Sequence, residues 1–260
     1  LDVYSTPTYG SMTNAQRTDY ASAAIVGKPI NGLWSYQYAG LNEEGRAQFY
    51  NEKGEKVLKG MNNIEGLVYS GTTMPLVQGG FTNTFVYKGV TLSVLLVGNF
   101  GNVIRLRNMT DGQAFAYPEA TQNMSKEWAY RWRKPGDENY TNIPALNTVA
   151  GAHASPWWNS GTNVTHRIAS NIYEMYDNSD IRVVSGNYLR LSSLSFRYNV
   201  DDRFCKKLGL KSAYINLTGT NLFTIAHKKL RGQDPTQSGS SPSVNLSVRP
   251  TYSCNLSITF

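Results

Sequence analysis

Residues 251–260 read Thr-Tyr-Ser-Cys-Asn-Leu-Ser-Ile-Thr-Phe, and this stretch decides the fold class. Every second side chain is apolar, from Tyr252 through Cys254, Leu256 and Ile258 to Phe260, and those between are small and polar. Strict alternation predicts a β-strand with one apolar and one polar face. In a soluble sandwich the polar face would meet water. In a membrane barrel it would meet a hydrated lumen, and the apolar face would meet lipid.

Two upstream segments, residues 194–200 and 213–218, alternate in the same way and predict two more strands. The short polar stretch at 201–210 between them predicts a turn with at most one helical loop. The leucines at 189 and 191 are out of phase with the apolar residues of 194–200. This phase change predicts a β-bulge near Ser192, because one extra residue restores a strand's apolar face.

Further upstream, residues 81–87 and 90–100 predict two long strands joined by a tight turn at Lys88-Gly89. From about residue 101 to residue 180 the alternation fails, and a helix within 118–133 is the only regular element we expect there. Connections this long are commonly functional. The region is rich in aromatic residues, among them Trp128, Trp132, Trp157 and Trp158.

The composition suits strands and turns, with 17 tyrosines, 23 glycines and only 17% charged residues. The formal net charge of +7 would suit nucleic acid, anionic lipid or an acidic substrate, but no basic run concentrates it. The clusters at 206–207 and 227–229 are best interpreted as solvated turns. No apolar run is long enough for a transmembrane helix, which leaves strands as the possible membrane-spanning elements.

The segments with alternating apolar residues also resemble a known protein family. Residues 186–200 resemble the Gly-x-Tyr-Leu-Arg-Leu strand of the SusC/RagA family of TonB-dependent transporters from the Bacteroidetes outer membrane. Lys-Leu-Gly-Leu at 207–210 and Gly-Thr-Asn-Leu-Phe-Thr at 219–224 follow in that family's order and spacing. Gly-Gln-Asp-Pro at 232–235 and Arg-Pro-Thr-Tyr at 249–252 look like the start of its last loop and the entry to its last strand.

The resemblance implies an all-β fold, an antiparallel transmembrane β-barrel of about 22 strands with a plug and long extracellular loops. Residues 1–260 would be its C-terminal portion, and 101–180 a long extracellular loop region. Fewer strands can be counted here than such a barrel needs, and open edges cannot lie in lipid. We therefore expect the signal peptide, the plug and the earlier strands to lie outside this chain.

The function implied by the resemblance is uptake of oligosaccharide or oligopeptide nutrients across the outer membrane. The implied partners are the remainder of the barrel and plug, a SusD-like surface lipoprotein, TonB and outer-membrane lipid, with no role for nucleic acid. Stacking and hydrogen bonding suit both substrates. The expected contacts to substrate or lipoprotein are Trp128, Arg131, Trp132, Tyr140, Trp157 and Trp158. Tyr252, Leu256, Ile258 and Phe260 would form the barrel-assembly signal.

No enzyme signature appears. The histidines at 153, 166 and 227 have no metal-ligand spacing, and neither a nucleophile elbow nor a phosphate loop occurs. We expect no cofactor, although the polar loop at 177–180 could hold calcium. The alternative function is a secreted β-sandwich that binds carbohydrate. A barrel exposes one sheet face to lipid, whereas a sandwich buries that face against a second sheet; the residues concerned are Leu92, Val94, Leu194, Phe196, Leu256 and Ile258.

Overall fold

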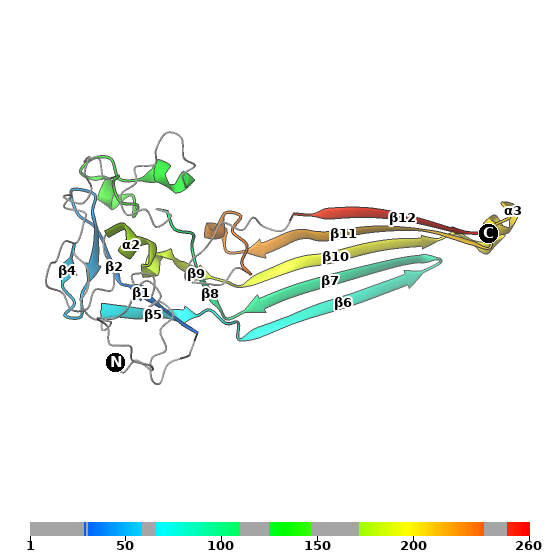
Figure 1. The fold of residues 1–260 in the computed structure, drawn as a ribbon, viewed down its shortest axis with the longest axis horizontal. Helices are drawn as coiled ribbons and strands as arrows, with labels where there is room; N and C mark the ends of the chain where they lie inside the picture. Colours follow the sequence, from blue (N-terminus) through cyan, green and yellow to red (C-terminus); the bar gives the residue numbers. More distant parts are fainter. Residues whose placement is uncertain (1–28, 30, 59–65, 110–124, 147–171, 237–248) are drawn as a thin grey trace, which may run out of the picture. The chain divides into compact units, whose positions relative to one another are not determined.

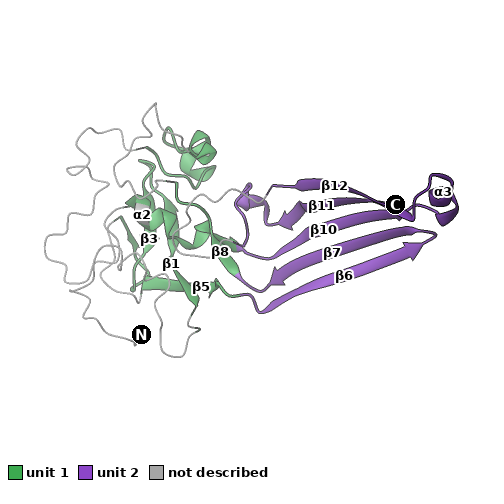
Figure 2. Cartoon of the chain, turned by 45° about the vertical axis from the view of Figure 1, so that its right-hand side comes forward, with its two compact units in different colours: residues 1–74, 103–184, 237–244 green, residues 75–102, 185–236, 245–260 purple. Residues whose placement is uncertain are grey.

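The computed structural model describes most of the chain, namely residues 29, 31–58, 66–109, 125–146, 172–236 and 249–260. The chain divides into two compact units, shown in different colours in Figure 2. Unit 1 draws on ranges 1–74 and 103–184, and unit 2 on 75–102, 185–236 and 245–260. Because each unit has its own set of internal contacts, the two are described separately.

Unit 2 is a single antiparallel sheet of five strands in the order β12-β11-β10-β7-β6. Figure 1 shows the five strands lying side by side as one extended layer. They range from nine to fifteen residues in length. Their bounds are β6 Val77–Tyr87, β7 Val90–Phe100, β10 Tyr188–Asn199, β11 Ser212–Ala226 and β12 Thr251–Thr259.

The turns of unit 2 follow from local residue chemistry. Lys88 and Gly89 both have positive φ, 42° and 83°, as a tight hairpin between twisted strands requires. The connection from β10 to β11 carries one short helix, α3 Asp202–Lys207. The Asp201 side chain caps α3 by accepting a hydrogen bond from the Arg203 amide, and Cys205 is the buried residue of this helix. Both predicted turns are confirmed.

The bulge predicted near Ser192 is also confirmed. The register of β10 shifts between Leu191 and Ser193 against both of its neighbours, β7 and β11. On β7, which has no shift against β6, Val94 and Leu96 share one face. Leu191 pairs with Leu96 and Leu194 pairs with Val94, so the bulge keeps leucines of opposite parity on the same face.

Unit 1 is built from short strands and helical turns. β1 pairs with β5, β2, β3 and β4 form a three-stranded sheet, and β8 pairs with β9. Among the described residues, the region between 101 and 180 contributes β8, two 3-10 helices and α2 to this unit. The bounds are β1 Gly32–Tyr36, β2 Tyr38–Leu41, β3 Ala47–Tyr50, β4 Lys56–Val57, β5 Leu67–Thr72, β8 Val103–Arg105, β9 Val183–Ser185, α2 Ile172–Asp177, η4 Lys126–Tyr130, η5 Asp137–Asn139 and η7 Asp180–Arg182.

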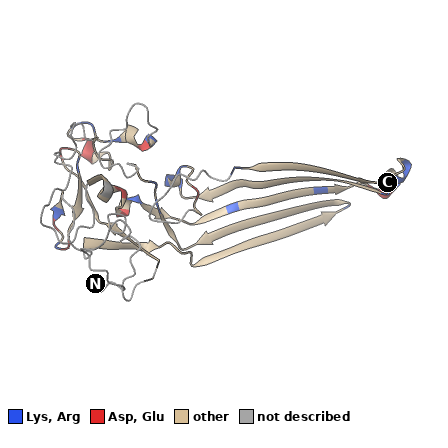
Figure 3. Cartoon of the chain, in the orientation of Figure 1, with Lys and Arg blue, Asp and Glu red and all other residues tan. Residues whose placement is uncertain are grey.

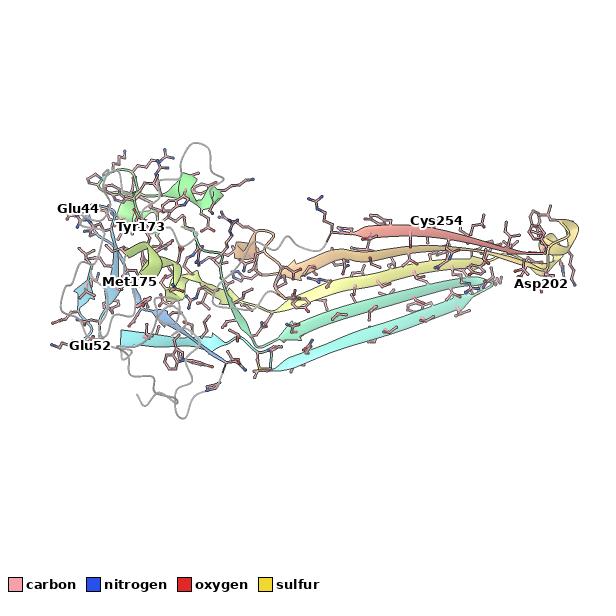
Figure 4. The ribbon with its side chains drawn as sticks, in the orientation of Figure 1. Glu44, Glu52, Tyr173, Met175, Asp202 and Cys254 are labelled. Carbon is pink, nitrogen blue, oxygen red and sulfur yellow. The ribbon has the colours of Figure 1, made fainter. Side chains whose placement is uncertain are left out.

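The core of unit 1 is aromatic. β1 contributes Trp34 and Tyr36, β3 contributes Phe49, and α2 contributes Tyr173 and Met175, both labelled in Figure 4. Tyr36 and Phe49 meet edge to face, with ring centroids 6.1 Å apart. Of the helix expected within 118–133, residues 118–124 lie outside the described part of the chain, and a 3-10 helix spans Lys126–Tyr130.

A buried cation connects three segments of unit 1. Arg105 at the end of β8 has no exposed surface, and it donates hydrogen bonds to the carbonyls of Trp34 and Ser179 and to the Ser35 hydroxyl. Burial lowers the pKa of Arg105 to about 10, with opposing contributions from nearby charges, so the guanidinium stays protonated at neutral pH. Because unpaired buried carbonyls are costly, Arg105 stabilises the packing of β1 against the segment that follows α2.

In the part of the chain that the structure describes, no helix has the length and apolar character needed to cross a membrane.

Candidate functional site

The two faces of the unit 2 sheet differ sharply in chemistry. Directly paired residues of an antiparallel sheet lie on the same face, so the register assigns every strand position to a face. One face is apolar, and its central row is Phe85, Leu92, Phe196, Leu217 and Cys254. The six residues expected to share a face do so, because Val94 pairs with Leu194, Leu256 with Ile215, and Ile258 with Ala213.

This apolar face is open. Phe85 keeps 58% of its surface exposed and Leu256 keeps 63%. Among the described residues of unit 2, these five strands form the only sheet. A β-sandwich would cover the face with another sheet, whereas contiguous exposed apolar surface marks contact with lipid or another protein.

The opposite face is rich in hydroxyl groups. A row of five, one from each strand, consists of Thr84, Ser93, Ser195, Thr218 and Ser253. Leu95 and Val97 also lie on this face, so the row is a polar band rather than a uniformly polar surface. Hydroxyls both donate and accept hydrogen bonds, which suits contact with water or with polar solutes.

Hydrogen bonds join the side chains of this band. The hydroxyls of Thr84 and Ser93 lie 3.1 Å apart across β6 and β7. The Ser195 hydroxyl donates to Asn216 Oδ1 at 2.9 Å, and Asn216 Nδ2 donates to the Thr218 hydroxyl at 3.2 Å. Because these groups partner one another, the band holds its side chains in place without a ligand.

Two arginines are the only charged residues within the five strands, and both belong to the polar face. Arg197 lies over the Tyr214 ring, with its guanidinium carbon 3.8 Å from the ring centroid, and its Nε donates to Asn199 Oδ1. Arg190, nearer the other end of β10, lies over the Tyr188 ring at 5.4 Å. Figure 3 shows how sparsely charge is distributed along the strands.

Arg190 also clamps the segment that follows β11. Its Nη2 donates to both carboxylate oxygens of Asp234 at 3.0 Å, and its Nε donates to the Thr224 hydroxyl. The Asp234 side chain is only 3% exposed and also accepts hydrogen bonds from the amide and hydroxyl of Thr236. Burial acts to raise the pKa of Asp234, but the bonds from Thr236 and the charge of Arg190 outweigh it and hold that pKa below its usual value.

The aromatic residues predicted to contact substrate or lipoprotein lie in unit 1, in different environments. Trp128 is buried in the core and donates its indole N–H to the Met109 carbonyl. This placement gives Trp128 a packing role. Tyr140, which follows η5, is 91% exposed and available for contact.

Trp132 and Arg131 are half-buried in the same unit. The Trp132 indole donates to Glu138 Oε2 at 2.9 Å, and this hydrogen bond lowers the pKa of Glu138. The Trp132 ring also lies against Gly45, where an added Cβ would fall 2.4 Å from a ring carbon. Arg131 donates to the Trp128 carbonyl. Trp157 and Trp158 lie outside the described residues, and ligand contact by any of the six stays a prediction.

The predicted barrel-assembly residues share the apolar face of β12 or follow it. Tyr252, Leu256 and Ile258 are exposed on that face, and Phe260, just after the strand, is 77% exposed. Their exposure is compatible with recognition by an assembly factor and equally with lipid contact. The recognition role stays a prediction.

The loop considered for calcium is occupied by protein hydrogen bonds. Asp177 accepts a bond from the Met109 amide, and Asp180 accepts bonds from the amides of Tyr38 and Ile181. Among the described residues, no group of three or more histidine, cysteine, aspartate or glutamate side chains is arranged to hold a metal ion. Calcium binding therefore stays a prediction without a site.

Sequence reasoning missed the polar-face residues that carry charge. Arg190 and Asp234 both lie in stretches that carry the family resemblance, yet nothing local links residues 44 positions apart. Arg197 lies in the alternating segment 194–200, but its stacking on Tyr214 was not predicted. The sequence feature that could have identified Arg190 and Arg197 is that they are the only charged residues in the five strands.

Comparison with known proteins supports the family resemblance. No protein-family model matches the chain. It is 28% identical over 209 residues to the TonB-dependent receptor P26 of Formosa agariphila, covering 76% of this chain and 18% of that receptor. The chain thus spans about a fifth of this relative's length.

Solved structures of RagAB have the same fold. The whole chain superposes on the RagAB peptide importer in its open-open state with a TM-score of 0.65 and 17% identity, covering 24% of that chain. For the closed-closed state of RagAB the TM-score is 0.64 and the sequence identity is 18%, and the match covers 25% of that chain. The predicted resemblance to TonB-dependent transporters of the SusC/RagA type is confirmed. The relatives found are described as a receptor and an importer, in agreement with the expectation of a transporter and not an enzyme.

Proposed function

We propose that this chain, with the sequence and fold of TonB-dependent transporters of the SusC/RagA type, forms part of the barrel wall of an outer-membrane nutrient importer. The observation that carries the proposal is the unit 2 sheet, which has an open apolar face and a hydroxyl-rich opposite face. In a barrel the first face contacts lipid and the second lines a hydrated lumen.

The strand lengths support this function. A tilted strand needs about 9 to 11 residues to cross the hydrocarbon core of a bilayer. The five strands have 11, 11, 12, 15 and 9 residues in chain order. Every strand is therefore long enough to span a membrane, and the two charged side chains within them belong to the face assigned to the lumen.

The remainder of the barrel is supplied by polypeptide outside this chain. Within the described sheet, β6 and β12 are the outer strands, and each has one edge without a partner. Unpaired backbone groups are too costly in lipid, so further strands must close the barrel. The share of the RagAB chain that is covered, about a quarter, leaves room for those strands and for a plug.

The substrate is an oligopeptide or an oligosaccharide. A SusD-like surface lipoprotein takes part in its uptake, and TonB energises the transport. The transport needs no covalent chemistry from this chain. Peptide is the first substrate class to test, because the RagAB structures are described as those of a peptide importer. Tyr140 and Trp132 are the described candidates for contact with substrate or lipoprotein.

A gene deletion tests this function. A strain that lacks the gene encoding this chain should fail to grow on defined oligopeptides or on defined oligosaccharides, and should still grow on the free monomers. Uptake in the parent strain should stop when TonB is removed. Normal growth and uptake of every oligomer tested in the deletion strain would contradict the proposal.

A further inference from the structure

One end of unit 2 combines exposed apolar side chains with basic ones. α3 and the residues after it carry Phe204 and Leu208, which are 58% and 61% exposed. They are four positions apart, a spacing that places two side chains on the same side of a helical turn. Two large apolar side chains are therefore exposed together on an otherwise polar connection.

The same connection is basic. Arg203, Lys206, Lys207 and Lys211 are all exposed, and the acidic side chains of this connection are Asp201 and Asp202. Asp201 caps α3 through its side chain. Lys88, in the β6–β7 turn, lies at this end of the sheet as well, because the Asn199 amide donates to the Gly89 carbonyl at 2.8 Å. In Figure 3 the ribbon of α3 is coloured blue where its basic residues lie.

This end is firmly attached to the sheet. Cys205 is fully buried, and the Lys211 amide donates to the Thr259 carbonyl at the end of β12 at 2.8 Å. The Val200 amide donates to the Ala213 carbonyl, which closes the connection where β10 and β11 meet. The exposed side chains are therefore mounted on a fixed base at the ends of the strands.

We propose that this α3 rim, defined as Lys88 together with residues 203–211, docks onto anionic phospholipid headgroups at the membrane surface. The inference rests on the proposed function, in which the apolar face of the sheet contacts lipid. Phe204 and Leu208 enter the interfacial layer, and the basic side chains contact phosphate groups. Charge complementarity identifies the partner, since each exposed basic residue near an anionic surface strengthens binding roughly fivefold.

Depth measurements test the docking. The complete transporter that contains this chain is placed in vesicles of phosphatidylcholine with and without phosphatidylglycerol. With Cys205→Ser and Cys254→Ser as background, a nitroxide is attached at Phe204→Cys, and in a separate protein at Phe196→Cys on the apolar face of β10. The expected result is that oxygen reaches both labels more readily than a water-soluble nickel chelate does, and that phosphatidylglycerol moves the label at 204 deeper.

The control label at position 196 distinguishes failure of the rim inference from failure of the proposed lipid-facing sheet. If the label at 196 contacts lipid and the label at 204 stays in water in both vesicle types, the rim inference is overturned and the importer proposal survives. If both labels contact water, the lipid-facing sheet is wrong, and the rim inference is overturned with it.

A charge variant tests the choice of lipid without relying on a label. Lys206→Gln with Lys207→Gln should lower the phosphatidylglycerol retained by the purified complex by roughly tenfold or more, while Lys206→Arg with Lys207→Arg retains it. Lys228→Gln with Lys229→Gln, which alters another exposed basic pair of unit 2, is the matched control and should change little. Equal losses from both glutamine pairs, or no loss from either, would overturn the proposal.

Discussion

Arg190 on β10 holds both carboxylate oxygens of Asp234 at 3.0 Å, although the two residues are 44 positions apart in the chain. The contact ties the segment after β11 to the polar face of the sheet. Because Asp234 also accepts two hydrogen bonds from Thr236, one carboxylate organises the whole turn. These contacts thus hold residues 234–236 against the polar face of the sheet.

Removing one charge of this clamp should loosen the turn. We expect Asp234→Asn to lower the free energy of unfolding by about 2 kcal/mol, because hydrogen bonds to charged groups stabilise more than hydrogen bonds between neutral groups. Hydrogen exchange at the Thr236 amide, which donates to Asp234, should accelerate in the variant. Lys229→Gln, an exposed change in the same connection, is the control and should leave that exchange unaltered. Unchanged protection of Thr236 in Asp234→Asn would mean that the clamp does not organise the turn.

The clamp should also respond to acid. The pKa of Asp234 is lowered from its ordinary value of 3.8, so the folded state binds this proton less readily than the unfolded chain. Its contribution to stability is therefore fully present above about pH 4 and is lost as the pH falls through the lower folded value. We expect the protection factor of the Thr236 amide to stay constant down to about pH 4 and to fall below it. A fall already between about pH 5 and 7 would show that another group controls the turn.

Two of the predicted contact residues should behave in opposite ways. Trp128 is 4% exposed in the core, so Trp128→Ala should lower the free energy of unfolding by about 3 to 5 kcal/mol. Tyr140 is 91% exposed, so Tyr140→Ala should change that free energy by less than about 0.5 kcal/mol. If Tyr140 contacts substrate, its variant binds oligopeptide or oligosaccharide several-fold more weakly at unchanged stability. Thermal unfolding and ligand titration of the purified complex measure both quantities, and a Trp128→Ala protein as stable as the parent would refute the packing role.

Neighbouring positions on β10 offer a matched test of the two faces. Leu194 lies on the apolar face beside Val94, whereas Ser195 lies on the polar face beside Ser93. An arginine on a lipid face costs about 2 to 4 kcal/mol near the bilayer midplane, whereas one in a lumen is solvated. Leu194→Arg should therefore reduce the amount of assembled transporter in the outer membrane, and Ser195→Arg should not. Equal yields, or the reverse order, would argue against the assignment of the faces.

The strands were largely predictable because their information is local. The alternation at 251–260 matches β12, the positive φ values at Lys88-Gly89 match the expected hairpin, and the phase change near Ser192 matches the bulge. The start of β6 was missed, since Gly79 and Gly80 have low strand propensity. They are nevertheless strand residues because they pair with Gly98 and Val97 of β7.

Unit 1 and the clamp were not predictable, because both depend on residues that are distant in the sequence. Trp128 was predicted to contact substrate or lipoprotein, whereas its burial depends on a core assembled from β1, β3 and α2. Arg105 gave no signal, since nothing around it in sequence indicates the carbonyls of Trp34 and Ser179 that it bonds. Residues 101–180 were expected to be a long extracellular loop region, and their described parts from Val103 onward belong to unit 1. Their position relative to the membrane stays a prediction.

The most direct test of the account is the state of the native protein in detergent extracts of the outer membrane. Electrophoresis with and without heating, followed by identification of the co-purifying chains, measures it. We expect a heat-modifiable complex in which this chain accompanies barrel and plug polypeptide and a surface lipoprotein. A stable monomer of 28.9 kDa that remains soluble without detergent would contradict it, because the open apolar face could not then be a lipid contact.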